Sequence, residues 1–246
     1  LSEEAWRAGV RIWVMHNYAW FPGLRALQLE VAQGRVGEIM EVRAQMLQQG
    51  FVRQFDGEVP KPQAWRRRDY QVPTVALDLG IHLFQVVMTA TDVKPTRTWE
   101  LRAGSNIWGV CDSIDWFGLD DQGRKFGFSV GKRFLGREND LQIWVFGTQG
   151  AAGWSLAQAD SLTLATSDGS SSRIPRDVLE SRHEKLRSLS RFKGGHPTGF
   201  VEAMSNAYDA VFREIMAETS ELFFEPIPIA TSIAAFKSLA TATRLT

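Results

Sequence analysis

Residues 97–166 switch repeatedly between short segments of strand character and tight turns, and this pattern constrains the fold more than any other feature. Within the segments, aromatic and aliphatic side chains often alternate with polar ones, as in strands buried on one face. Turn-forming residues stand at 120–123 and 147–150. Strands joined by tight turns pair antiparallel. The candidate strands are 97–103, 113–119, 124–134, 140–147, 150–157 and 161–166. The pattern predicts a large, mostly antiparallel sheet.

The remaining periodic segments predict one more strand and a few helices. The strand is expected over 39–47, and the helices from Pro22 to before Gly34 and over 75–90, 198–217 and 229–243. The polar stretch 50–73 predicts a long ordered loop, and the Ser-, Arg- and Gly-rich stretch 167–195 a partly mobile one. So few helices can cover only one face of the sheet. We therefore predict an α/β (α+β) fold in which an open-faced sheet carries its helices on one face.

The predicted strands hold many large apolar side chains, which suggests that the second face of the sheet also needs a partner. These residues include Trp99, Trp116, Phe117, Phe126, Phe128, Ile143, Trp144 and Phe146. We predict a homo-oligomer, a dimer or tetramer, that forms through the open sheet face. The alternative is that all these side chains point into a single core.

Composition argues against several classes of partner. Lysine plus arginine and aspartate plus glutamate number 28 each, so no excess charge attracts nucleic acid or an anionic membrane. No apolar run approaches the roughly 20 residues that span a bilayer. The single cysteine, Cys111, cannot form an intramolecular disulfide and fits a reducing compartment. We predict a cytoplasmic protein that binds neither nucleic acid nor membranes.

The segment 74–83 holds the most informative polar residues. On a helix, Asp78 and His82 lie four residues apart and share one face. A carboxylate beside an imidazole can fix the ring tautomer and stabilise the protonated form, which suits a general base. Gly80, a poor helix former, suggests that something approaches the backbone closely. The alternative is a surface pair without a role.

This segment resembles the Asp-x-Gly-x-His helix of the Gfo/Idh/MocA oxidoreductases, the family of glucose–fructose oxidoreductase and inositol dehydrogenase. Further motifs resemble that family in the same order along the chain. They are Val14–Pro22, Gln33–Ile39, Trp65-Arg66, Phe146–Gly150 and His196–Ala203. The resemblance runs in register from about residue 5 to the C-terminus, which makes it more specific than any single motif.

The resemblance implies hydride transfer between NAD or NADP and a hydroxyl-bearing carbon of a sugar, inositol or related polyol. His82 would then be the catalytic acid/base, with Asp78 orienting it or gripping a substrate hydroxyl. Trp65 and Arg66 would lie near the cofactor, where a guanidinium can pair with phosphate oxygens. Asn17 and His196 would contact the substrate, although His196 could instead cap or pack a helix start. No metal is implied.

The chain also departs from the family pattern. The Glu-Lys-Pro motif and the Gly-x-Gly-x-x-Gly turn are absent from the sequence, Ala19 replaces an arginine, and Gln85 replaces an acidic residue. We expect residues 1–20, which read as a helix end at 3–8 and a strand at 10–15, to be a remnant of the end of a Rossmann domain. Residues 21–246 would form a C-terminal substrate-binding and oligomerisation domain.

Two other functions stay open from the sequence. The missing nucleotide motif favours a non-catalytic oligomerisation module derived from such a dehydrogenase. A metal-dependent hydrolase would need Asp78, His82 and His196 to converge on one ion.

Overall fold

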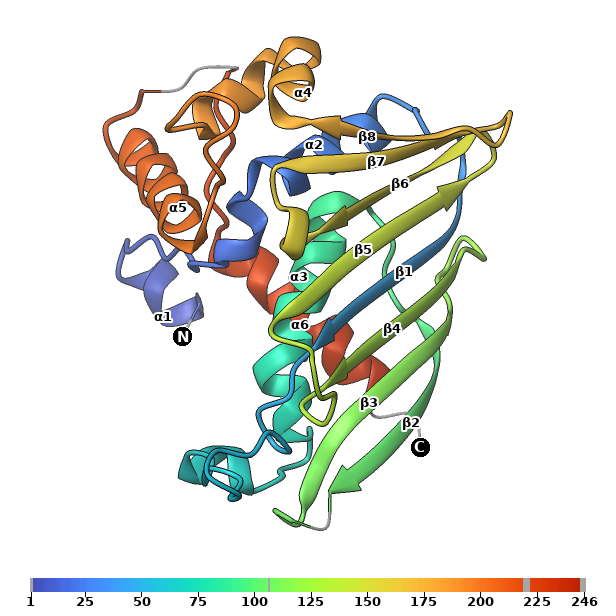
Figure 1. The fold of residues 1–246 in the computed structure, drawn as a ribbon. Helices are drawn as coiled ribbons and strands as arrows, with labels where there is room; N and C mark the ends of the chain where they lie inside the picture. The colour runs from blue at the N-terminus through green and yellow to red at the C-terminus, as the bar shows by residue number, and fades with distance from the viewer. Residues whose placement is uncertain (1, 106, 219–221, 244–246) are drawn as a thin grey trace.

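An eight-stranded sheet forms the centre of the protein in the computed structural model, which describes residues 2–105, 107–218 and 222–243 (Figure 1). Its strand order is β2-β3-β4-β1-β5-β6-β7-β8. The strands are β1 (Ile39–Leu47), β2 (Arg97–Ser105), β3 (Val110–Leu119), β4 (Lys125–Gly131), β5 (Asp140–Gly147), β6 (Gly150–Ser155), β7 (Ser161–Thr166) and β8 (Ser171–Pro175). Neighbours pair antiparallel except β1 and β4, which are parallel. The predicted mostly antiparallel sheet is confirmed.

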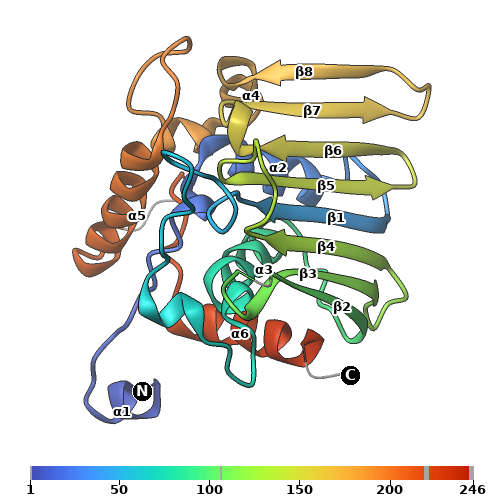
Figure 2. The same ribbon diagram turned by 60° about the horizontal axis from the view of Figure 1, so that its bottom comes forward.

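The helices that pack on the sheet lie on one face, as predicted (Figure 2). They are α2 (Pro22–Ala32), α3 (Ile81–Ala90) and α6 (Ile229–Ala242). At one end of the sheet stand α1 (Ser2–Arg7), α4 (Arg176–Arg182) and α5 (Phe200–Ile215). None of the helices in the described part of the chain has the length and apolar content needed to cross a bilayer.

The large apolar side chains of the strands divide between the two faces, because side chains alternate along a strand. Trp116, Phe126, Phe128 and Ile143 are buried under the helices, where Phe84 of α3 packs edge-on against Trp116 at 5.6 Å between ring centroids. On the open face, Trp99 stacks on Phe117 at 6.2 Å, and Trp144 on Phe146 at 5.9 Å. The alternative of a single core holding all these residues is therefore wrong.

The strand predicted over 10–15 is wrong. Only Trp13 makes a β-bridge, to Pro228, and the 3-10 helix η1 (Asn17–Trp20) follows. The backbone hydrogen bonds of this segment to a distant one reach only residues 227–229 among the described residues, which is too short a match for a strand ladder. Trp20 is nevertheless part of the main core, so residues 17–20 pack with the body of the fold.

The stretch 167–195 is more regular than its composition predicted. It contains β8, α4 and the 3-10 helix η5 (Glu184–Leu189). The end of this stretch is held by the buried Arg176 guanidinium, which donates hydrogen bonds to the carbonyls of Phe192, Lys193 and His196. These contacts are long-range, so local composition did not reveal them.

The predicted helix 75–90 exists but begins irregularly. Residues Ala76–Gly80 form a π-helical turn, and α3 continues from Ile81. A Cβ atom on Gly80 would lie 3.0 Å from Leu239 and 3.3 Å from Trp116. The close approach predicted at Gly80 is confirmed, and core side chains make it. Single π-helical turns inside helices often occur at functional sites.

Candidate active site

Asp78 is the centre of a charged cluster at the start of α3. The Arg66 guanidinium binds its carboxylate through two hydrogen bonds, of 2.8 and 3.2 Å. The Lys132 ammonium lies 2.8 Å from the same carboxylate and also donates to Gln48 at 2.7 Å. Asp78 and Lys132 are largely buried, so this is a semi-buried ion triad.

The two cations set the charge state of Asp78. Burial by itself raises the pKa of the carboxyl, but the hydrogen bonds from Arg66 and Lys132 outweigh it and lower the pKa below its usual range. Burial lowers the pKa of the Lys132 ammonium, and Asp78 offsets part of that. Asp78 is therefore ionised at neutral pH and already neutralised by its neighbours.

His82 lies next to this triad, among aromatic rings. Its ring centroid is 5.3 Å from that of Tyr18 and 6.1 Å from that of His16, both in edge-to-face geometry. The Nδ1 atom of His82 is buried and has no hydrogen-bond partner. A buried polar atom without a partner is costly, so a ligand or water that satisfied it would be stabilised there.

The sequence predicted that Asp78 would favour the protonated form of His82, and the balance of effects runs the other way. Burial lowers the pKa of His82, and the charge of Asp78 offsets this only in part. The physical reason is that desolvation of the buried ring outweighs the attraction of the Asp78 charge, which acts in the predicted direction. A neutral imidazole at pH 7 can accept a proton.

His16 forms the other side of the ring cluster. Its Nε2 atom lies 3.0 Å from the Ser232 hydroxyl of α6. Burial, with a smaller contribution from His82, lowers the pKa of His16 to about 4. Burial and then Asp78 raise the pKa of the Tyr18 phenol. The cluster therefore holds two neutral imidazoles and a neutral phenol beside one compensated carboxylate.

The other predicted site residues fall in two places. Asn17 is buried next to His16 in the chain, and its Nδ2 atom has no partner. Trp65 is 46% exposed and carries the Arg66 guanidinium 4.5 Å above its ring. His196 is exposed, and its contacts are with Phe192 and Arg176. Asp78, His82, Arg66 and Trp65 are thus brought together, and His196 lies with the segment before α5.

Sequence reasoning missed Lys132, Tyr18 and the role of His16. Lys132 directly follows the apolar end of β4, a position where a lone lysine must find a buried partner. His16 and Tyr18 were part of a quoted motif, but only their contacts with His82 give them a place in the site.

In the part of the chain that the structure describes, no three His, Cys, Asp or Glu side chains are grouped as metal ligands. His82 and Asp78 do not line the cavity of about 900 Å³ between α2, α3 and α5, nor the hollow on the open sheet face around Arg43 and Trp144. The hydrolase hypothesis has no geometric support, since His196 makes its contacts elsewhere.

Comparison with known proteins gives a match in structure only. No protein-family model matches the chain, and no curated protein matches its sequence. An oxidoreductase from Pseudomonas syringae matches with a TM-score of 0.80 and 17% identity, over 98% of this chain and 64% of that one. An inositol dehydrogenase homolog from Azotobacter vinelandii, solved with NADH and myo-inositol, matches with a TM-score of 0.78 and 18% identity, over 99% and 64%.

A third match is levoglucosan dehydrogenase in complex with NADH and levoglucosan, with a TM-score of 0.75 and 15% identity, over 96% of this chain and 64% of that chain. The chain spans 62% to 64% of the length of the first solved structures that it matches. The fold that the sequence resemblance implied is confirmed: this chain has the fold of the C-terminal domain of inositol dehydrogenase-type oxidoreductases.

Proposed function

We propose that this chain is the substrate-handling part of an NAD(P)-dependent dehydrogenase that acts on a sugar, inositol or related polyol. The observation that carries the proposal is His82, a neutral imidazole with an unpartnered nitrogen beside an ionised carboxylate. Oxidation of an alcohol carbon needs a group that accepts the hydroxyl proton as the hydride leaves. His82 would be that group.

Asp78 then acts as a positioning residue. With both carboxylate oxygens held by Arg66 and Lys132, it has a fixed orientation and can accept a further hydrogen bond from a substrate hydroxyl. Its charge also favours the imidazolium that forms when His82 takes the proton. Asn17, with a free amide N–H, would contact a second hydroxyl.

A nicotinamide cofactor, when bound, supplies the hydride acceptor. The exposed Trp65 indole fits a planar ring by stacking. Arg66 fits a phosphate less well than the resemblance implied, because Asp78 and Gln63 use its N–H groups. We therefore propose that the phosphates bind to a dinucleotide-binding domain, which would also close the site over His82.

Residues 1–20 would belong to the side of the molecule that joins this domain, and residues 21–246 would bind the substrate and pair subunits. His196 stays a predicted substrate contact. A His196→Ala variant that raises KM without lowering kcat would support that role, and an unchanged KM would leave only its contact with Phe192.

The experiment that tests the proposal is His82→Ala in the protein that carries this chain, assayed with NAD and NADP on a panel of inositols and sugars. We expect kcat to fall about 100-fold or more, with little change in the free energy of unfolding. His82→Gln distinguishes proton transfer from shape, because glutamine keeps polarity but cannot titrate. Unchanged turnover per folded molecule in either variant would reject the role.

The open face of the sheet supports a proposal on assembly. Trp99, Leu101, Phe117 and Phe146 are all more than a third exposed there. Such a patch on a sheet without covering helices favours a second copy of the chain. A Phe117→Asp variant should reduce the mass measured by light scattering to that of a monomer, whereas Lys237→Asp, on the exposed side of α6 and away from the open sheet face, should not. A monomeric parent protein would reject this assembly.

A further inference from the structure

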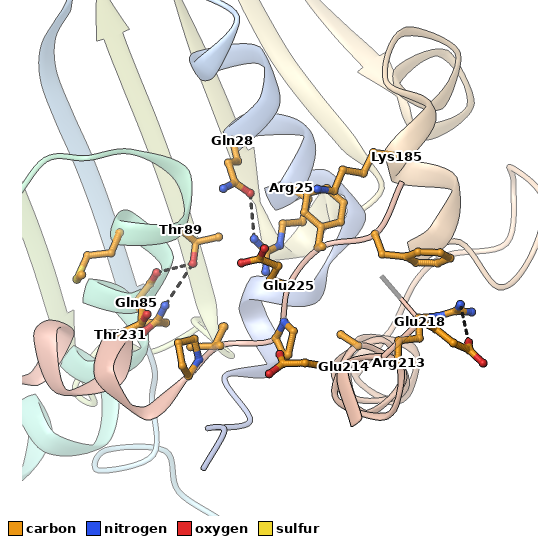
Figure 3. A pocket seen from close by; sticks show the side chains of 17 residues that line it. Arg25, Gln28, Gln85, Thr89, Lys185, Arg213, Glu214, Glu218, Glu225 and Thr231 are labelled. Atoms are coloured by element: carbon orange, nitrogen blue, oxygen red, sulfur yellow. Dashed lines mark hydrogen bonds and ion pairs between the residues drawn. The ribbon is translucent and has the colours of Figure 1, made fainter. Parts of the chain in front are cut away.

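A cavity of about 900 Å³ lies between α2, α3, α5 and the segment that leads into α6 (Figure 3). Its lining includes neither His82 nor Asp78, so the inference drawn from it does not rest on the proposed function. Figure 3 shows Arg25 and Lys185 near one another, with Gln85 and Thr89 on another side. The polar lining is thus divided into a cationic part and an amide–hydroxyl part.

Arg25 is the unusual residue of this cavity. Its side chain is only 6% exposed, yet no carboxylate of the described residues lies within 4.0 Å of it. The guanidinium lies between the rings of Trp20 and Phe224, 4.9 and 4.8 Å from their centroids, and donates to Gln28 at 3.0 Å. Its Nε atom is buried without a partner. Buried arginines normally pair with an anion.

A second cation stands beside Arg25. The Lys185 ammonium lies 4.6 Å from the Phe224 ring and is close enough for the charge of Arg25 to lower its pKa, in addition to the lowering by burial. Two cations around one ring repel each other unless a negative charge joins them. An anion bound here would pair with the buried Arg25 guanidinium and would also reduce its repulsion with Lys185.

The acids that line the cavity do not cancel this charge. Glu214 pairs with Arg11 at 3.2 Å, and Glu218 with Arg213 at 3.7 Å. Glu225 acts on Lys185. Among the described residues, none of these acids lies within 4.0 Å of Arg25, so its buried guanidinium has no direct anionic partner in this partly open cavity.

The opposite side of the cavity offers an acceptor. Gln85 is 2% exposed, its Nε2 atom donates to Thr89 at 3.4 Å, and its Oε1 atom is buried without a partner. An unpartnered amide oxygen accepts a hydrogen bond from a hydroxyl group. The cavity therefore matches a molecule with an oxyanion at one end and hydroxyl groups at the other.

We propose that this cavity is a binding site for a small hydroxylated oxyanion, a sugar phosphate or a sugar acid, held by Arg25 and Lys185 through the anion and by Gln85 through a hydroxyl. The apolar parts of Phe224 and Met88 would cover the carbon skeleton. The site is separate in its residues from the His82 cluster, and it would hold this ligand whether or not the protein is a dehydrogenase.

The test is isothermal titration calorimetry with three probes: glucose 6-phosphate, gluconate and, as a neutral control, glucose. We expect saturable binding of at least one anion and none of glucose at the same concentration. Phosphate binding without gluconate binding would identify a phosphate site, and the reverse a carboxylate site. Failure of both anions to bind would overturn the proposal.

Variants locate the binding. Arg25→Met and Lys185→Met should each weaken the anion at least about tenfold, which corresponds to the loss of a charged hydrogen bond. Arg173→Met, an exposed arginine of β8, should leave the affinity unchanged. Gln85→Leu should weaken the hydroxylated anion but not inorganic phosphate. Equal affinity in Arg25→Met and the parent protein would overturn the assignment, and Lys185→Met supplies the same readout if Arg25→Met does not fold.

Discussion

Two buried cations of this molecule, Lys132 directly after β4 and Arg25 in α2, have different kinds of partner. Lys132 shares the Asp78 carboxylate with Arg66, so this buried ammonium has an anionic partner 2.8 Å away within the chain. Arg25 has two aromatic rings and a glutamine amide in place of a carboxylate. The contrast teaches that Lys132 has its anion within the chain, whereas Arg25 could obtain one only from a bound ligand.

The largest expected effect comes from removing the charge of Asp78, the shared partner of Lys132 and Arg66. Asp78→Asn leaves Lys132 and Arg66 facing each other without their shared anion, so we expect the free energy of unfolding to fall by about 3 kcal/mol. Urea denaturation followed by tryptophan fluorescence measures it. A loss below about 1 kcal/mol would show that solvent, and not Asp78, compensates the two cations.

The next largest effect is expected from a fall in pH, which should lower the stability through His16 but not through Arg25. Because burial lowers the pKa of His16 to about 4 in the folded state, the unfolded chain binds a proton more readily between its ordinary pKa of 6.5 and that value. The stability contributed is full above pH 6.5 and is lost as the pH falls through 4, by about 3 kcal/mol in total. Arg25 itself does not titrate there, since its pKa is lowered only to about 10.

The matched variant for this effect is His16→Gln, which keeps a polar partner for Ser232 but has a side chain that does not ionise. The difference in unfolding free energy between parent and variant should shrink from pH 7 to pH 4.5. A difference that does not change with pH would contradict the pKa shift of His16.

A smaller loss is expected from Lys132→Met. Asp78 then keeps its two hydrogen bonds from Arg66 and loses one charged partner, so stability should fall by about 1–2 kcal/mol. Lys125→Met, on the exposed lysine of β4, is the control and should stay within about 0.5 kcal/mol.

The smallest effect is expected from Arg25→Met measured without added anion. Methionine has a similar length, and removal of an uncompensated buried charge offsets the loss of the two ring contacts, each about 1 kcal/mol. Stability should therefore be unchanged or slightly higher. A fall of 2 kcal/mol or more in the free energy of unfolding would mean that Arg25, like Lys132, stabilises the fold.

Much of the fold could be read from local pattern. Alternation along β3 and β5 placed Trp116 and Ile143 on one face and Phe117 and Trp144 on the other, because a strand has a period of two. The stretch 167–195 could not be read in this way. Its order depends on Arg176, whose partners lie 16 to 20 residues away in the chain.

The candidate site, too, could be predicted from the sequence only in part. The spacing of Asp78 and His82 and the Trp65-Arg66 pair followed from motifs, and the structure brings them together. The direction of the pKa shift of His82 did not follow, since it depends on how deeply the ring is buried, and burial outweighs the charge of Asp78.

By itself the sequence determined the antiparallel sheet with one covered face, because side-chain periodicity and turn residues act over a few neighbours. Only the tertiary structure decided which charges are compensated. Pairing of Asp78 with Lys132, and the isolation of Arg25 between Trp20 and Phe224, arise where distant segments meet. The reason is that electrostatic and desolvation energies depend on what surrounds a group in space, and not on its neighbours in the chain.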